Sequence, residues 1–259
     1  PLPARSGVDA KAGQRRRMTV TMVSPPGPAV FGKRALPESW EAAVLLVDKP
    51  QGLTSFGVVK RIRHRVPVRK VGHAGTLDPM ATGLLIVLVG RATKTMEQFM
   101  GLDKVYTGTI RLGQTTPSFD AETEASTAVP VDHLTDEHIK IGTRPLTGEI
   151  VQTTPVYSAV KVGGERLYKK ARRGEDVVLP PRHVRVDRFE TSPRVGPDVD
   201  FVVECSKGTY IRSLANDLGA DLGVGGHLVA LRRTAIGPHS VADAWEFEAL
   251  LGALEDQNG

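Results

Sequence analysis

The chain has 259 residues, and its 34 Lys and Arg outnumber its 29 Asp and Glu to give a formal net charge of +5. An apolar fraction of 40% and a charged fraction of 24% are typical of a globular protein and exclude a largely disordered or fibrous chain. The longest apolar stretch, residues 84–89, is far shorter than the roughly 20 residues that a membrane span needs. The single cysteine excludes an internal disulfide and no Cys/His cluster has zinc-ligand spacing, so we expect a cytoplasmic protein without metal.

The net charge is concentrated at the N-terminus. Residues 1–39 hold seven basic and two acidic residues, whereas residues 40–259 hold 27 of each sign. Pro, Gly, Ala and Arg dominate the first stretch, and no periodic apolar pattern precedes Trp40. We therefore predict a basic, disordered N-terminal extension over residues 1–39 and one domain over residues 40–259. Met18 and Met22 are candidates for the native start.

In the first half of this domain, short apolar runs alternate with turns and helical patterns. A helix is predicted to begin at Thr54 or Ser55, and its apolar residues include Phe56, Val59 and Ile62. Strands are predicted at residues 44–47, 84–89 and 105–112, a glycine-rich loop at residues 71–83, and further helices at residues 92–100 and 135–144.

The second half repeats this mixture. Strands are predicted at residues 156–162, 183–190, 199–206 and 228–236, and helices at residues 165–173, 209–222 and 245–255. Gly223 is expected to end the second of these helices. Because strands and helices are interspersed and many strands follow one another directly, we predict a mixed α/β sheet domain.

A second concentration of positive charge lies inside this domain. Residues 49–94 hold nine basic residues and one acidic residue, a local net charge of +8, whereas residues 95–259 are net acidic. Such a stretch suits contact with a phosphate backbone. A solvated helix face with a few ion pairs would have the same composition, so charge alone does not decide between the two interpretations.

The one acidic residue of that stretch, Asp78, lies in the glycine-rich loop. Gly72, Gly75 and Gly83 allow tight turns or a close approach to a ligand, and Pro79 restricts the backbone of Asp78. A carboxylate in a rigid loop among cations is a candidate nucleophile or base, because cationic neighbours favour its ionised form. The alternative is a loop aspartate that accepts local backbone hydrogen bonds.

A second candidate string, residues 205–213, joins a predicted strand to a predicted helix. Gly208 allows a sharp turn there, and Tyr210 and Arg212 are expected to project from the first helical turn. The alternative is a surface arginine and a packed tyrosine, with Cys205 as a buried strand residue. The chain lacks the glycine-rich phosphate-binding motifs, the H-E-x-x-H metal motif and the G-x-S-x-G serine motif.

These candidate residues belong to a series of strings that occur in one order along the domain. The strings are Val47-Asp48-Lys49-Pro50, residues 72–83, Tyr106, residues 112–116, residues 157–161, residues 167–168, residues 207–212 and Leu231-Arg232-Arg233. Together they resemble the bacterial TruB tRNA pseudouridine synthases over about residues 44–241. Six or more motifs in register are far more specific than any single one.

The resemblance implies a pseudouridine synthase catalytic fold, with a mixed, mainly antiparallel central sheet flanked by helices. It implies isomerisation of uridine 55 in the T arm of tRNA, in which uracil leaves ribose C1′, rotates and rejoins through its C5. No cofactor is implied. The catalytic roles go to three residues: Asp78 attacks the nucleoside or removes a ribose proton, Arg212 pairs with Asp78, and Tyr210 takes the C5 proton.

The resemblance also implies four substrate-binding residues. Tyr106 matches an aromatic residue that stacks on the target base, and Leu231 matches an apolar wall of the uracil pocket. His73 matches a residue that fills the space left by the flipped nucleotide, and Lys49 matches one that packs beside the catalytic loop. Base flipping costs a few kcal/mol, and stacking on one aromatic side chain returns about 1–3 kcal/mol.

Two departures accompany the resemblance. The extension over residues 1–39 has no counterpart, and the chain ends soon after Pro238, so we expect no C-terminal PUA-like RNA-binding domain. The implied partner is the T-arm stem-loop of tRNA. We expect no membrane contact, no protein partner and a monomer.

Three alternative functions remain. The first is an RNA-binding or RNA-folding protein whose isomerase activity is secondary, and the presence of every catalytic position argues against an inactive enzyme. The second is a small-molecule hydrolase that uses Asp78, which would need a second catalytic group that the motifs do not supply. The third is a guide-RNA-dependent rRNA pseudouridine synthase, which would be expected to carry the missing C-terminal domain.

Overall fold

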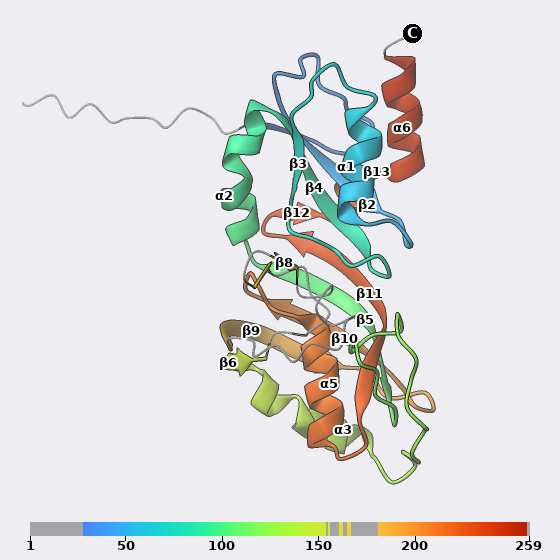
Figure 1. The fold of residues 1–259 in the computed structure, drawn as a ribbon. Coiled ribbons are helices and arrows are strands. Elements are labelled where there is room, and N and C mark those ends of the chain that lie inside the picture. Colours follow the sequence, from blue (N-terminus) through green and yellow to red (C-terminus); the bar gives the residue numbers. More distant parts are fainter. Residues whose placement is uncertain (1–27, 154, 156–160, 163–164, 167–180, 258–259) are drawn as a thin grey trace, which may run out of the picture.

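The computed structural model describes residues 28–153, 155, 161–162, 165–166 and 181–257. Eleven of its strands form one sheet, in which eight strands follow the order β1-β2-β4-β11-β5-β10-β9-β6 (Figure 1). Strands β3, β12 and β13 pair with β4, β11 and β2, respectively. The strands are β1 (Ala29–Phe31), β2 (Ala42–Lys49), β3 (Val71–Ala74), β4 (Thr82–Gly90), β5 (Lys104–Leu112), β6 (Gly148–Gln152), β9 (Arg182–Thr191), β10 (Asp198–Cys205), β11 (Gly226–Ile236), β12 (His239–Ser240) and β13 (Trp245–Glu246).

Helices cover this sheet at both of its ends. They are α1 (Ser55–Arg63), α2 (Met96–Gly101), α3 (Asp136–Gly142), α5 (Ile211–Asp221) and α6 (Phe247–Asp256), with short 3-10 helices at Arg91–Thr95, Arg144–Leu146 and Val241–Asp243. Figure 1 shows α1, α2 and α6 at one end and α3 and α5 at the other, with β5 and β11 side by side between them. The pairs β1–β2, β4–β11 and β2–β13 are parallel and the other described pairs are antiparallel, which confirms the predicted mixed, mainly antiparallel α/β sheet.

The two longest apolar runs of the sequence form strands that are buried on both faces. Alternate residues of β2 and β4 pack under α1 and α6 on one side, with Leu45 and Leu85 among them. The intervening residues, such as Leu46 and Ile86, pack on the other side together with Ala92 of the first 3-10 helix. A strand with two buried faces reads as a continuous apolar run, which explains why these strands were predictable.

Several predicted elements need correction. Residues 71–74 were predicted as loop but form β3, and β6 was not predicted. The apolar face of α1 is formed by Val58, Val59 and Ile62, whereas Phe56 is 60% exposed. Thr54 is the N-cap, since its side chain accepts a hydrogen bond from the Gly57 N–H.

Two further predictions concern segments of which only parts are described. Residues 165–166 pair as strand β8 (Glu165–Arg166) with β7 (Lys161–Val162), so the predicted helix does not start at residue 165. The remainder of that helix, most of the predicted strand at 156–162, and the similarity strings at 157–160 and 167–168 lie outside the described residues.

Part of the predicted N-terminal extension belongs to the sheet. Strand β1 pairs in parallel with β2, and Phe31 and Leu36 pack against the same core as α6. The side chain of Trp245 donates a hydrogen bond to the Ala35 carbonyl at 3.0 Å. Residues 28–39 were therefore wrongly assigned to a disordered extension, and residues 1–27 lie outside the described residues.

No helix within the described ranges is long and apolar enough to cross a membrane.

Candidate active site

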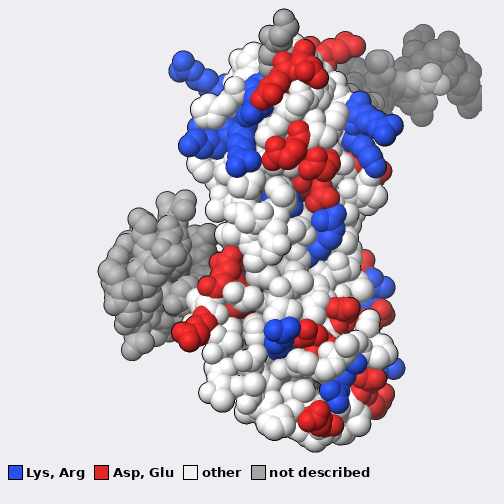
Figure 2. Space-filling view, turned by 90° about the vertical axis from the view of Figure 1, so that its right-hand side faces the viewer, with Lys and Arg blue, Asp and Glu red and all other residues white. Residues whose placement is uncertain are grey.

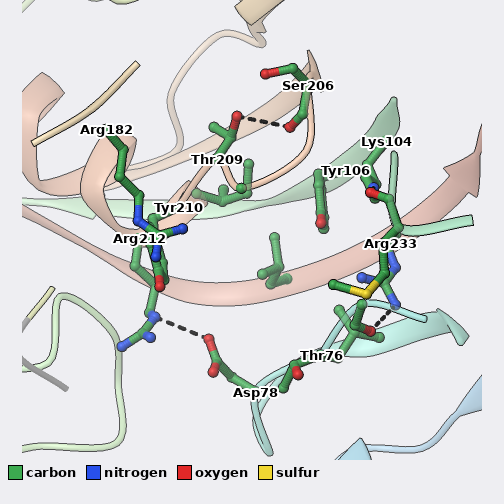
Figure 3. A pocket seen from close by; sticks show the side chains of 16 residues that line it. Thr76, Asp78, Lys104, Tyr106, Arg182, Ser206, Thr209, Tyr210, Arg212 and Arg233 are labelled. Carbon is green, nitrogen blue, oxygen red and sulfur yellow. Dashed lines mark hydrogen bonds and ion pairs between the residues drawn. The ribbon is translucent and has the colours of Figure 1, made fainter. Parts of the chain in front are cut away.

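A cavity of about 390 Å³ opens between the β3–β4 loop, strands β5 and β11, and the start of α5. Five of the seven predicted site residues line it, namely Asp78, Tyr106, Tyr210, Arg212 and Leu231. Figure 3 shows the Asp78 and Arg212 side chains facing one another on one side of this cavity and Tyr106 with Lys104 and Arg233 on the other. The cavity therefore gathers residues from distant parts of the chain around one carboxylate.

The backbone next to Asp78 is held by hydrogen bonds from three other segments. The Pro79 carbonyl accepts from the Gly52 N–H at 2.8 Å, and the Met80 N–H donates to a Glu122 carboxylate oxygen at 3.2 Å. On the other side of Asp78, the Ser55 hydroxyl accepts from the Leu77 N–H at 2.8 Å and lies 3.1 Å from the Leu77 carbonyl. Because the peptides before and after Asp78 are both fixed, the carboxylate is presented on a rigid support.

Arg212 is oriented from behind by the start of α5. The side chain of the buried Gln152 accepts from the Tyr210 N–H at 2.9 Å and donates to the Tyr210 carbonyl at 3.2 Å, which fixes the residue that caps the helix. Arg212 Nε then lies 3.0 Å from Asp78 Oδ2, in an ion pair whose arginine side chain is only 6% exposed. The structure therefore places Arg212 and Asp78 in contact, as the resemblance implied.

A second carboxylate, Asp120, contacts the same guanidinium and was not predicted. Asp120 Oδ2 lies 3.3 Å from Arg212 Nη1, and its side chain is 1% exposed. Its other oxygen accepts from the Ser118 hydroxyl at 2.6 Å and from the Glu122 N–H at 3.0 Å. In the sequence, Asp120 is the first acidic residue after the motif at residues 112–116. Nothing in its distance along the chain from Arg212 indicated that the two side chains are in contact.

Burial raises the pKa of Asp78 above its ordinary value, and the guanidinium of Arg212 opposes this shift. Asp120 raises the same pKa further, whereas Lys49 lowers it. Cationic neighbours were expected to favour the ionised form, and they do, but the desolvation of the carboxylate is the larger influence. A more basic carboxylate is a better proton acceptor and nucleophile than a solvent-exposed aspartate.

The two tyrosines and Leu231 supply the aromatic and apolar surface of the cavity. Burial raises the pKa of Tyr106 above its ordinary value, and the charge of Arg233 opposes this shift. The Tyr210 ring lies under the guanidinium of Arg182, which is 5.5 Å from the ring centroid. Surfaces of this kind suit the flat face of a ring such as a nucleobase.

The other two predicted residues do not line the cavity. Lys49 is fully buried beside the loop, where its ammonium donates to the carbonyls of Pro50, Leu53 and Pro79, and burial lowers its pKa to about 8. His73 lies on β3 opposite Val87, and its buried Nδ1 atom has no hydrogen-bond partner among the described residues. Burial lowers the pKa of His73, which favours the neutral imidazole.

The positive stretch at residues 49–94 is only partly available for binding. Within the described part of the chain, Arg61, Arg65 and Arg91 form ion pairs with Glu248, Glu255 and Glu41, respectively. Figure 2 shows this mixture, with basic side chains over the upper part of the molecule and acidic side chains set among them. The ion pairs agree with the interpretation of a solvated face, whereas contact of the exposed cations with a phosphate backbone stays a prediction.

Three of the other cations gather away from the cavity. Exposed Arg69, Lys70 and Lys94 line a groove of about 480 Å³ with Arg91, at the Gly90 end of β4. The Asp78 loop joins the opposite end of that strand, roughly 26 Å away at the usual rise per strand residue. No group of three His, Cys, Asp or Glu side chains suited to a metal ion occurs in the described ranges.

Comparisons with known proteins show which family the chain resembles. A family model described as TruB family pseudouridylate synthase (N terminal domain) matches residues 63–211, and one described as tRNA pseudouridylate synthase B C-terminal domain matches residues 212–258. A protein of Paenarthrobacter aurescens named tRNA pseudouridine synthase B is 50% identical over 220 residues, which are 83% of this chain and 71% of the relative. Its namesake from Thermobifida fusca is 53% identical over 215 residues, which are 80% of this chain and 73% of the relative.

Solved structures share the fold over a shorter part of their own length. A Cbf5-Nop10-Gar1 complex contains a chain that is 32% identical with a TM-score of 0.59, and the match covers 81% of this chain and 54% of that one. An H/ACA RNP bound to a substrate RNA containing 2′-deoxyuridine gives 28% identity and a TM-score of 0.60, with 81% and 52% covered. This chain thus spans about half the length of those chains. The family match over more than half of the sequence, together with the close relatives, confirms the resemblance: the chain belongs to the TruB family of pseudouridylate synthases.

Proposed function

We propose that this chain isomerises uridine 55 in the T arm of tRNA to pseudouridine. The observation that carries the proposal is the Asp78–Arg212 ion pair, at 3.0 Å, in a cavity that also presents Tyr106 and Tyr210. Relatives at about 50% identity bear the name tRNA pseudouridine synthase B, which supports tRNA as the substrate class. The reaction is an isomerisation that retains both the base and the ribose, so it needs neither an oxidant nor a second substrate.

In the proposed reaction, the target nucleotide leaves the RNA loop and its uracil stacks on Tyr106. Asp78 acts on the ribose, either by attacking C1′ or by removing a ribose proton, and the bond between C1′ and N1 breaks. The uracil rotates and C5 forms the new bond to C1′, as the bond from C1′ to Asp78 breaks or, in the other alternative, as Asp78 returns the ribose proton. The Tyr210 hydroxyl takes the C5 proton and gives up its own, so that the net transfer is of one proton from C5 to N1. Arg212 keeps the Asp78 carboxylate oriented throughout, because a guanidinium can hold a carboxylate and other acceptors at once.

The other predicted residues have supporting roles in this proposal. Leu231 lines the cavity from β11 and forms the apolar wall against the uracil. Lys49 holds the carbonyl of Pro79 and thereby the loop. His73, on the neighbouring strand β3, fills the space that the flipped nucleotide leaves. We further propose that the enzyme acts as a cytoplasmic monomer without a cofactor.

The test is incubation of the full chain with a T-arm transcript that contains no guide RNA, followed by mapping of pseudouridine at nucleotide resolution. We expect one product, at uridine 55, and none when Asp78→Ala replaces the wild type, while the variant still binds the RNA. Pseudouridine made by Asp78→Ala would remove Asp78 from the chemistry. A strict requirement for an added guide RNA would favour the guide-dependent alternative.

A further inference from the structure

We propose that Arg233 is a positioning residue that holds both ends of the catalytic loop and Tyr106 in one arrangement. The catalytic loop is here residues 75–81, which connect β3 to β4 and carry Asp78. The inference rests on the proposed function, because the same cavity is concerned, but it assigns a role to a residue that the proposed reaction does not use.

The sheet register puts Arg233 between the two parts that it is proposed to join. On β11, Arg233 is the partner of Gly83 on β4, in a parallel pair, and of Tyr106 on β5, in an antiparallel pair. Gly83 has a φ of +101°, and a Cβ at that position would lie 2.3 Å from the Arg233 carbonyl oxygen. The glycine thus permits a backbone approach just beyond the end of the loop that another residue would prevent.

The Arg233 guanidinium contacts the backbone near both ends of the catalytic loop. Nε donates to the Leu84 carbonyl at 2.8 Å, just beyond the end of the loop, and Nη2 donates to the Gly75 carbonyl at 3.1 Å, at its start. Tyr106 is the register partner of Arg233 on β5, and the positive charge of Arg233 lowers the pKa of the Tyr106 phenol against the effect of burial. One planar group therefore joins the start of the loop to the backbone just beyond its end, and Figure 3 shows Arg233 beside the Tyr106 side chain.

The positive charge of Arg233 is buried, which is energetically unfavourable. Arg233 is 1% exposed, and in the described part of the chain no carboxylate lies within ion-pair distance of it. After burial itself, its charge is the next influence that lowers the pKa of His73 and Lys104. A buried charge without a counterion is destabilising unless it makes several hydrogen bonds, and the fork of the guanidinium makes such bonds to the Leu84 and Gly75 carbonyls.

The neighbour Arg232 provides a matched control. It has the same chemistry on the same strand, but its guanidinium pairs with Asp48 at 2.6 Å and donates to the Thr82 hydroxyl on β4 at 3.3 Å, and its side chain is 40% exposed. Strand alternation sends the two arginines to opposite faces of the sheet, and only Arg233 lines the cavity that contains Asp78. A lysine at either position keeps the charge and loses the fork.

The experiment compares Arg233→Lys, Arg232→Lys, Tyr106→Phe and the double variant Tyr106→Phe/Arg233→Lys with the wild type. The readouts are the single-turnover rate on the T-arm transcript, the dissociation constant of that RNA and the melting temperature. We expect Arg233→Lys to lower the rate at least tenfold with RNA affinity within threefold of wild type, and Arg232→Lys to stay within twofold in both. Tyr106→Phe keeps the stacking ring but loses the hydroxyl, so its rate should fall at least threefold, and the double variant should be no slower than Arg233→Lys.

Rates of Arg233→Lys and Arg232→Lys that fall equally, or an Arg233→Lys rate within twofold of wild type, would overturn the proposal. If Arg233→Lys shows no melting transition, Tyr106→Phe decides, since a rate within twofold of wild type would remove the link between the two residues. A wild type that makes no pseudouridine at uridine 55 would instead contradict the proposed function. In that case the same ratios are measured at whichever uridine the wild type modifies.

Discussion

Arg212 lies between two carboxylates that differ in their access to the cavity. Asp78, at 3.0 Å, has a side chain that is 37% exposed, whereas Asp120, at 3.3 Å, is 1% exposed. Arg212 Nη1 also donates to the Ser118 carbonyl at 2.9 Å, so the guanidinium is anchored before any substrate arrives. A side chain fixed from behind can hold the exposed carboxylate at a constant angle, which is the property that positioned catalytic groups need.

Replacement of Asp120 by Asn tests this anchoring. The amide keeps the shape but removes the charge, and loss of one partner of a buried ion pair costs about 3–5 kcal/mol in the free energy of unfolding. We expect the single-turnover rate to fall roughly 10²-fold, the effect of a small misplacement of catalytic groups. Chemical denaturation and single-turnover kinetics measure the two losses.

Asp200→Asn is the control for that variant. Asp200 is a carboxylate of the same sheet and accepts from the Thr109 hydroxyl at 2.6 Å, but it contacts no residue of the Asp78–Arg212 pair. We expect its rate and stability to remain near those of the wild type. A rate for Asp120→Asn that equals the rate for Asp200→Asn would exclude the anchoring role.

At the level of elements, the catalytic loop depends on the N-terminus of α1. Ser55→Ala removes the hydroxyl that pairs with the Leu77 backbone and leaves a buried N–H without its partner, which costs about 1–3 kcal/mol. We expect the turnover number to fall as well, because the peptide before Asp78 is released. Thr54→Ala is a close comparison: it removes the N-cap bond to Gly57 at a similar cost of about 1 kcal/mol, yet it leaves the loop untouched. Equal activity losses in the two variants would show that the loop responds only to helix stability.

An element of the fold could be predicted where its burial leaves a recognisable pattern in the sequence. Strands β2 and β4 were predicted because both faces are buried and the sequence is uniformly apolar. Strand β3 was missed because its four residues include one glycine and are mostly half-buried, so no alternation shows. Asp78 and Arg212 were predicted as site residues from the sequence motifs at residues 72–83 and 207–212.

Asp120 and Arg233 were missed as contributors to the site for a different reason. Their contacts join segments far apart in the sequence, and only the folded sheet shows that Asp120 reaches Arg212. In the sequence Arg232 and Arg233 are equivalent, and their different contacts can be told apart only when the face of β11 that each occupies is known. Long-range polar contacts of this kind leave no periodic trace in a sequence.

Over the whole molecule, burial of Lys49 makes stability depend on pH. Burial lowers the pKa of Lys49 from 10.5 to about 8, so between these values the unfolded chain binds more protons at this site than the folded chain. The free energy of unfolding contributed by Lys49 must therefore rise as the pH increases through this window. Urea denaturation of the wild type and of Lys49→Met, at several pH values, isolates this group from Lys104, which has a similar shift. We expect the free energy of unfolding of the wild type, relative to that of Lys49→Met, to increase by up to about 3 kcal/mol from pH 8 to pH 10.5. A difference in the free energy of unfolding that is independent of pH would contradict the buried ammonium.

The net charge of +5 says little about RNA binding, because many of the cations are already paired. The groove at the Gly90 end of β4 is the exception, since Lys70 and Lys94 are exposed there and no ion pair to either is among those that the structure describes. On the proposed function, a double reversal, Lys70→Glu/Lys94→Glu, should weaken binding of the tRNA substrate at least tenfold and reduce the steepness of its salt dependence, because fewer phosphates are neutralised.

The paired arginines provide the comparison for that reversal. Arg61→Glu/Arg65→Glu makes the same change in total charge, but it places new acids beside Glu248 and Glu255 of α6. If the positions of the cations matter, this second variant should lose stability through like-charge repulsion and keep more of its RNA affinity and salt slope than the first. Binding titrations at several salt concentrations measure both quantities. An equal loss of affinity and slope in the two variants would mean that the RNA responds to the total charge of the protein, and the groove would then have no particular role in binding.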